Sequence, residues 1–183
     1  GITILAPLER PLSSAHGCVL ASDVAAPWPL PSFDNSSMDG YAVRADDVAR
    51  AAADSPTTLT VLGDAAAGSG GGLEVGPGTA IRIMTGAPMP PGADAVVPVE
   101  SSDGGTATVA LTRSVDAGTY VRRRGEDVAE GQVVMRAGDV VTDRAVAVLA
   151  SVGCAEVPVH ARPRVVVIAG TVVAERVHLT SIV

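Results

Sequence analysis

The sequence predicts a β-rich α+β fold of irregular mixed sheets with few helices. Valine is abundant in short apolar runs, and β-branched side chains favour strands over long helices. The chain contains 20 glycines and 13 prolines, which are typical of the turns that join consecutive short strands. Because aromatic residues make up only 2% of the 183 residues, we expect an aliphatic core.

The N-terminal part of the chain carries only a weak pattern of apolar residues. A short apolar pattern is confined to residues 19–24. Proline then occupies every second position from Pro27 to Pro31. Because proline fixes its own φ and restricts the residue before it, we expect an extended path there.

Four β-rich runs follow, separated by clusters of glycine and proline, and each predicts a short strand. They cover residues 57–62, 79–84, 95–100 and 106–111. The glycine tract 68–72 lies between the first two. It lacks the Lys-Ser or Lys-Thr ending of a phosphate-binding loop, and no helix pattern follows it. We therefore expect this tract to form the flexible tip of a hairpin.

A helix is predicted in the last third of the chain. Apolar residues recur at helical spacing from 145 to 152, so the helix should begin at about Asp143. The side chain of Thr142 or Asp143 can accept a backbone N–H bond at its start. Gly153 can adopt the left-handed conformation that ends a helix.

Strands are expected on both sides of this helix, at residues 133–134 and 156–159. The Arg-Pro-Arg segment 162–164 marks a boundary, because a strongly apolar strand at 165–168 follows it directly. Such a strand is typical of the first strand of an α/β domain. The 15 residues beyond it are too few to complete that domain.

The net charge of −7 argues against two classes of partner. No basic stripe offsets it, so we expect the chain to bind neither nucleic acid nor an anionic membrane. No apolar stretch approaches the roughly 18 residues that a membrane-spanning helix needs. Cys18 and Cys154 lie far apart, with no disulfide framework or metal spacing around them, so we expect a reducing, cytoplasmic location.

Acids, hydroxyls and half of the aromatic side chains are concentrated in residues 31–43, which indicates a functional site. Asp39 precedes a glycine that permits a tight turn. A carboxylate held there suits a hard cation such as Mg²⁺ or the orientation of a water molecule. Asp34, Ser36 and Ser37 lie close by. The same spacing also fits an Asx-type turn whose side chains bond their own backbone.

A second candidate is the strand end at residues 82–88, where Gly86 follows the hydroxyl of Thr85. Glycine there could let backbone N–H groups approach an anion closely. An ordinary strand end, followed by a loop that prolines stiffen, explains the same residues.

The third candidate is a run of three arginines, Arg122, Arg123 and Arg124. Guanidinium groups match phosphate oxygens or other oxyanions bidentately. In an extended segment the first and third would share a face, so at most two would grip one ligand. Glu126 and Asp127 could instead neutralise the arginines in a solvated loop.

In order and spacing, these segments resemble the molybdopterin molybdenumtransferases, the family of bacterial MoeA and the gephyrin E domain. The similarity covers about residues 12–168 and includes residues 17–24, 76–88 and 138–159. The resemblance implies an enzyme of molybdenum cofactor biosynthesis that transfers molybdenum from molybdate to adenylylated molybdopterin, releases AMP and uses Mg²⁺. It also implies a homodimer in which the N-terminal region of one subunit faces the pterin-binding α/β domain of the other.

The resemblance assigns roles to particular residues. By motif matching, the expected catalytic residues are Asp39, Thr85 and Asp127. The first and last of these are also the expected metal ligands. The expected substrate or anion ligands are Ser36, Ser37, Arg122 and Arg124.

The resemblance further implies two lobes. Residues 1–27 and 128–163 would form a discontinuous first lobe, and residues 28–127 an inserted β-rich lobe that carries Asp39. Residues 164–183 would be the start of an α/β domain or an unrelated tail. After Ile168 the Ser-Thr-Gly segment and acidic residue of the family are missing, so the fold is expected to be truncated before the pterin-binding domain.

Two functions stay open at this point. The chain is the N-terminal part of a molybdenum insertase, expected to be inactive alone because the pterin-binding domain is missing. Alternatively, it is a noncatalytic dimerisation or protein-interaction module on the same scaffold, as in gephyrin.

Overall fold

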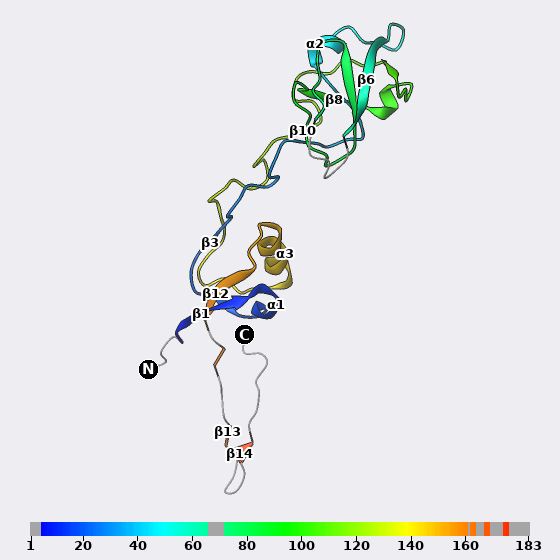
Figure 1. Ribbon diagram of the computed structural model, residues 1–183. Helices are drawn as coiled ribbons and strands as arrows, with labels where there is room; N and C mark the ends of the chain where they lie inside the picture. Colours follow the sequence, from blue (N-terminus) through cyan, green and yellow to red (C-terminus); the bar gives the residue numbers. More distant parts are fainter. Residues whose placement is uncertain (1–4, 66–71, 161, 164–166, 169–173, 176–183) are drawn as a thin grey trace. The chain divides into compact units, whose positions relative to one another are not determined.

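The computed structural model describes residues 5–65, 72–160, 162–163, 167–168 and 174–175. Its contacts divide the chain into two units: unit 1 comprises Gly1–Trp28 with Glu130–Val183, and unit 2 comprises Pro29–Ala129. Each unit is described by itself. The described residues form many short strands and few helices, as Figure 1 shows, which confirms the expected β-rich class.

Unit 2 is built on a five-stranded mixed sheet in the order β8-β5-β7-β6-β9. The strands are β5 (Gly40–Val43), β6 (Thr57–Ala65), β7 (Thr79–Ile83), β8 (Ala95–Pro98) and β9 (Thr108–Leu111). The four predicted runs therefore supply four of these strands. The third run is strand only as far as Pro98, because a 3-10 helix, η1 (Val99–Ser101), follows. A one-turn helix, α2 (Ala45–Val48), follows β5.

The connection between β6 and β7 differs from the prediction. These two strands pair in parallel, whereas the other pairs of the sheet are antiparallel. Parallel neighbours cannot be joined by a tight turn and need a crossover connection. The predicted hairpin between them is therefore wrong. The glycine tract itself, apart from Gly72, lies outside the described residues.

The core of unit 2 is mainly aliphatic, as its composition predicts. It includes Val43, Leu59, Val97 and Leu111, each at most 3% exposed. Tyr41 is the aromatic exception, and it is fully buried in β5. Its hydroxyl donates a hydrogen bond of 3.0 Å to the carbonyl of Gly105, so the polar end of the ring is satisfied.

Unit 1 joins segments from both ends of the described chain. β12 (Glu156–His160) pairs antiparallel with β1 (Pro7–Pro11) on one side and with β2 (Val19–Leu20) on the other. Figure 1 draws β1 in blue beside β12 in orange. β3 (Val24–Ala25) pairs with β11 (Val133–Met135). The predicted strands at 133–134 and 156–159 are therefore confirmed.

The tail after residue 163 is described only in part. β13 (Val167–Ile168) pairs antiparallel with β14 (Ala174–Glu175). The first half of the strand predicted at 165–168 lies outside the described residues.

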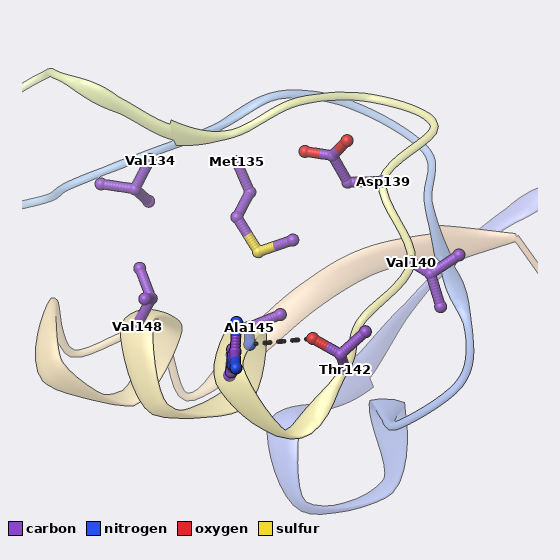
Figure 2. A pocket seen from close by; sticks show the side chains of 8 residues that line it. Val134, Met135, Asp139, Val140, Thr142, Ala145 and Val148 are labelled. Atoms are coloured by element: carbon purple, nitrogen blue, oxygen red, sulfur yellow. Dashed lines mark hydrogen bonds between the residues drawn. The ribbon is translucent and has the colours of Figure 1, made fainter.

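The described residues of unit 1 also form two helices, the one-turn α1 (Leu12–Ala15) and α3 (Asp143–Ser151). The α3 start agrees with the prediction, and the Thr142 hydroxyl accepts a 3.3 Å hydrogen bond from the amide of Ala145 (Figure 2). Gly153 is left-handed, with φ at +77°, as predicted for the helix end.

The proline-rich stretch is less extended than predicted. The backbone bends at Pro27 and Trp28 and again from Pro31, and the peptide bond between Leu30 and Pro31 is cis. Proline fixes φ but leaves its ψ open. Alternate prolines therefore do not determine a straight path.

Gly153→Ala should destabilise unit 1 by about 2–4 kcal/mol. A left-handed conformation costs an alanine roughly 1–2 kcal/mol. The added Cβ would also lie 1.8 Å from Cζ2 of Trp28, so the indole ring would have to move. Urea unfolding of the chain measures the loss.

Gly138→Ala is the matched control for this prediction. Gly138 is also left-handed, with φ at +90°, but no atom lies within 4 Å of an added Cβ. It should therefore show only the conformational cost. Equal losses in the two variants would contradict the contact with Trp28.

Candidate functional site

Unit 2 brings the three candidate segments side by side: the Asp39 segment (residues 31–43), the Thr85 segment (82–88) and the arginine segment (120–127). β4 (Asn35–Ser36) pairs antiparallel with β10 (Val121–Arg122), which joins the first segment to the third. On the other side, the amide of Ser36 donates to the carbonyl of Ala87, and the amide of Gly86 donates to the carbonyl of Ser36, at 3.1 and 2.8 Å. β4 therefore links all three.

The side chains of Asp39 and Thr85 are bonded to each other. One carboxylate oxygen, Oδ1, accepts hydrogen bonds from both the amide and the hydroxyl of Thr85, each at 2.7 Å. The two residues are 46 positions apart in the sequence and both are exposed. Neither bond uses Oδ2. Asp39 is thus held at one oxygen and presents the other for a ligand.

The hydrogen bonds from Thr85, first from its hydroxyl and then from its amide, lower the pKa of Asp39. The positive charge of Arg82 lowers it further. The carboxylate is therefore ionised at neutral pH. A carboxylate with a lowered pKa is a weak base, so this arrangement suits holding a cation or a water better than removing a proton.

Arg82 is a residue that the sequence analysis did not single out. It lies in β7, directly opposite Tyr41 of β5. It is half-buried, and its charge acts on Asp39. The sequence signal that could have identified Arg82 is its position in the Thr85 segment, on a strand that ends at the candidate site.

The arginine segment contains a tight ion pair. Nη2 of Arg122 lies 2.5 Å from both carboxylate oxygens of Asp127. This hydrogen bond, with the attraction between the charges, raises the pKa of Arg122. Both contacts use Nη2, so the Nε and Nη1 donors take no part in the pair. The guanidinium retains donors that match an oxyanion.

The other two arginines bind back to the Asp39 segment. Nη1 of Arg123 lies 2.7 Å from Oδ2 of Asp34, and the amide of Arg124 donates to Oδ1 at 2.7 Å. These bonds, the one from the Arg124 amide first, lower the pKa of Asp34. Only Arg122 of the three lies in β10, so the three side chains do not alternate along one strand.

The two serines expected to bind an anion are engaged within the protein. Ser36 is fully buried, and its hydroxyl donates to the carbonyl of Met38 at 2.6 Å and accepts from the amide of Met38 at 3.2 Å. The hydroxyl of Ser37 donates to the carbonyl of Tyr120 at 3.2 Å. Tyr120 has a positive φ of 58°, which is uncommon for a non-glycine residue. The serines therefore support the turn and the adjoining segment.

The backbone amides of the Thr85 segment do not form the anion-binding loop considered above. The amide of Thr85 donates to Asp39, that of Gly86 to Ser36, and that of Ala87 to the carbonyl of Met84. All three donors are satisfied internally. An anion at this position would have to displace one of these bonds, so of the two alternatives the ordinary strand end fits these residues better.

The described residues do not form a metal cage. Within the described ranges, no three His, Cys, Asp or Glu side chains are grouped so that they could hold an ion. Both oxygens of Asp127 face a guanidinium, whose positive charge opposes a second cation there. Asp39 and Asp127 therefore do not fit as a shared pair of metal ligands, whereas Asp39 alone keeps an oxygen for one.

A groove of about 400 Å³ lies in unit 1, whereas these segments belong to unit 2. In Figure 2, Met135 and Val134 of β11 face Val148 and Ala145 of α3 across it. None of the candidate residues lines this groove. The candidate site is instead an exposed surface of unit 2.

Comparisons with known proteins identify the family of this chain. Residues 2–153 match the family model of the MoeA N-terminal region, domains I and II. The chain belongs to this family.

Among the described residues, no helix is both long enough and apolar enough to cross a membrane.

Several MoeA proteins resemble this chain. Molybdopterin molybdenumtransferase 2 of Mycobacterium tuberculosis is 50% identical over 162 residues, which cover 88% of this chain and 40% of the relative. The molybdopterin molybdenumtransferase of Synechococcus elongatus is 40% identical, covering 85% of this chain and 39% of the relative. A MoeA crystal structure from Pyrococcus horikoshii gives a TM-score of 0.80 at 37% identity, covering 84% and 41% of the two chains. The chain thus spans about 40% of the length of the curated relatives.

Proposed function

We propose that this MoeA N-terminal region forms one wall of a site that transfers molybdenum from molybdate to adenylylated molybdopterin and releases AMP. The observation that carries the proposal is the pair of hydrogen bonds from Thr85 to Asp39, which joins two segments that resemble motifs of the enzyme. The names of the relatives support the reaction class. The chain spans about 40% of their length, so the activity is proposed for an enzyme that contains this region.

In this proposal, Asp39 orients the water that attacks phosphorus as the bond to AMP breaks. Its lowered pKa favours this positioning role over proton removal. The N–H donors of Arg122 that Asp127 leaves unused would offset negative charge on the phosphate oxygens. Thr85 holds Asp39 in place, because its hydroxyl donates a hydrogen bond to the carboxylate.

The other participants are proposed to be a second subunit and Mg²⁺. The second subunit would supply the pterin-binding wall of a homodimeric enzyme. Asp39 would be the one carboxylate ligand of Mg²⁺ from this chain, since magnesium is commonly held by one or two carboxylates together with substrate phosphates. When bound, the ion would neutralise charge on those phosphates.

A hybrid enzyme tests the proposal. In it, residues 2–153 of this chain replace the matching segment of the M. tuberculosis relative, which is 50% identical. We expect the hybrid to release AMP from adenylylated molybdopterin in a molybdate-dependent manner. A folded hybrid that releases no AMP would contradict the enzyme function and favour a noncatalytic interaction module.

A further inference from the structure

The carboxylate of Asp34 reaches across 89 positions of sequence to the arginine segment. Its Oδ2 contacts the guanidinium of Arg123 and its Oδ1 accepts from the amide of Arg124, both at 2.7 Å. One side chain therefore binds the two residues that directly follow Arg122. This contact is separate from the bonds between Asp39 and Thr85.

The backbone of Asp34 is itself fixed between the other two segments. Its carbonyl accepts a 2.9 Å hydrogen bond from the amide of Met89, just beyond the Thr85 segment. The next residue, Asn35, pairs with Arg122 in the β4 and β10 ladder. The carboxylate therefore projects from a backbone that is anchored on both sides.

Other bonds hold the arginine segment before and after this point. The β4 and β10 pairing fixes Val121 and Arg122, and the amides of Gly125 and Asp127 donate to the carbonyls of Pro31 and Leu30, each at 2.9 Å. The stretch between, residues 123–124, carries the bonds to Asp34. Without them, residues 123–124 of the turn that joins Arg122 to its partner Asp127 would lose their bonds to Asp34, while Arg122 and Gly125 on either side would stay attached to the Asp39 segment.

We propose that Asp34 is a positioning residue for the phosphate of the substrate, because it fixes the turn that sets the direction of the Arg122 guanidinium. This inference rests on the proposed function. The side chains of Asp34 and Arg123 are 37% and 58% exposed. An exposed ion pair of this kind adds roughly 0–1 kcal/mol to stability, so stability alone gains little from it.

Two substitutions separate the two bonds. In Asp34→Asn, the amide oxygen can still accept from the Arg124 N–H, but the side-chain NH₂ would face the guanidinium of Arg123, donor against donor. Asp34→Ala removes both bonds. In the full chain, hydrogen exchange at the Arg124 amide should therefore become faster in the alanine variant and change little in the asparagine variant. Unchanged exchange in Asp34→Ala would contradict the contact.

The kinetic test uses the hybrid enzyme. We expect Asp34→Ala to raise the KM for adenylylated molybdopterin about tenfold or more, as a misplaced binding group does, with kcat within about twofold. Arg123→Gln should raise it similarly, and the double variant should be no worse than the single ones. Asp54→Asn, at an exposed aspartate of unit 2 that belongs to none of the three segments, is the matched charge control and should leave KM unchanged.

The outcomes distinguish this inference from the proposed function. If the unsubstituted hybrid releases no AMP, the proposed function fails and the role of Asp34 in that reaction fails with it. If the hybrid is active but KM is unchanged in Asp34→Ala, only the positioning role is overturned. A fall in kcat that follows a fall in the thermal midpoint would also overturn it, because that pattern indicates a merely structural residue.

Discussion

Gly40→Ala should unfold unit 2 or lower its free energy of unfolding by at least about 4 kcal/mol. An added Cβ would lie 2.1 Å from the carbonyl oxygen of Val97 and 2.9 Å from Cα of Pro98. Both atoms belong to the backbone of β8, which cannot rotate away as a side chain can. Gly40 also pairs with Ile83 of β7, so β5 cannot withdraw from β8 without losing contacts on its other side.

The effect should extend from the sheet to the candidate site. Asp39 directly precedes Gly40, and its carbonyl accepts a 3.0 Å hydrogen bond from the amide of Val99, just beyond β8. A displaced β5 would therefore also displace the carboxylate from Thr85. Circular dichroism and thermal unfolding of the chain measure the loss of structure.

Gly76→Ala is the matched control in the same unit. Nothing lies within 4 Å of a Cβ at this position, and its φ is not in the left-handed range. It should change the free energy of unfolding by no more than about 0.5 kcal/mol. A Gly40→Ala chain as stable as Gly76→Ala would show that β5 and β8 do not lie as close as the structure places them.

The position of four of the five strands in the sheet of unit 2 could be predicted from the sequence, but their pairing could not. Residues 57–62 and 79–84 became β6 and β7 because β-branched side chains bounded by glycine and proline are local signals. Their parallel direction depends on the rest of the sheet, in which β9 lies on the other side of β6 and β5 on the other side of β7. Nothing within either run distinguishes a parallel from an antiparallel neighbour.

The helix α3, unlike the pairing of the strands, was predictable because all of its signals are local. Its apolar spacing, the cap at Thr142 and the stop at Gly153 all lie within a dozen residues of one another. Each acts on its own neighbours along the chain. No distant contact is required to specify where this helix begins and ends.

The candidate residues could be named from motifs, whereas their bonding partners could not. Whether Ser36 faced a ligand or its own turn was open on spacing alone, and the structure places its hydroxyl in the turn. The contact between Asp34 and Arg123 joins residues 89 positions apart, so it depends on the β4 and β10 pairing. The only sequence signal for this contact was the presence of an acid at the start of one segment and of three arginines in another.

In the hybrid enzyme, Asp39→Asn should lower kcat for AMP release at least about 100-fold, the usual loss when a group that acts on the transition state is removed. The asparagine oxygen can still accept the two hydrogen bonds from Thr85, so the fold should persist. What the substitution removes is the negative charge. Rates at saturating substrate, with circular dichroism of the same samples, measure both effects.

The pH dependence of this loss identifies the role of the acid. Hydrogen bonds from Thr85 lower the pKa of Asp39, so the carboxylate is charged above that lowered value and loses its charge only as the pH falls through it. The ratio of unsubstituted to Asp39→Asn rates should therefore stay constant across the neutral range. A ratio that rises through neutral pH would indicate a titrating general base instead. Full activity of a folded Asp39→Asn hybrid, or an equal loss in Asp54→Asn, would remove the proposed role altogether.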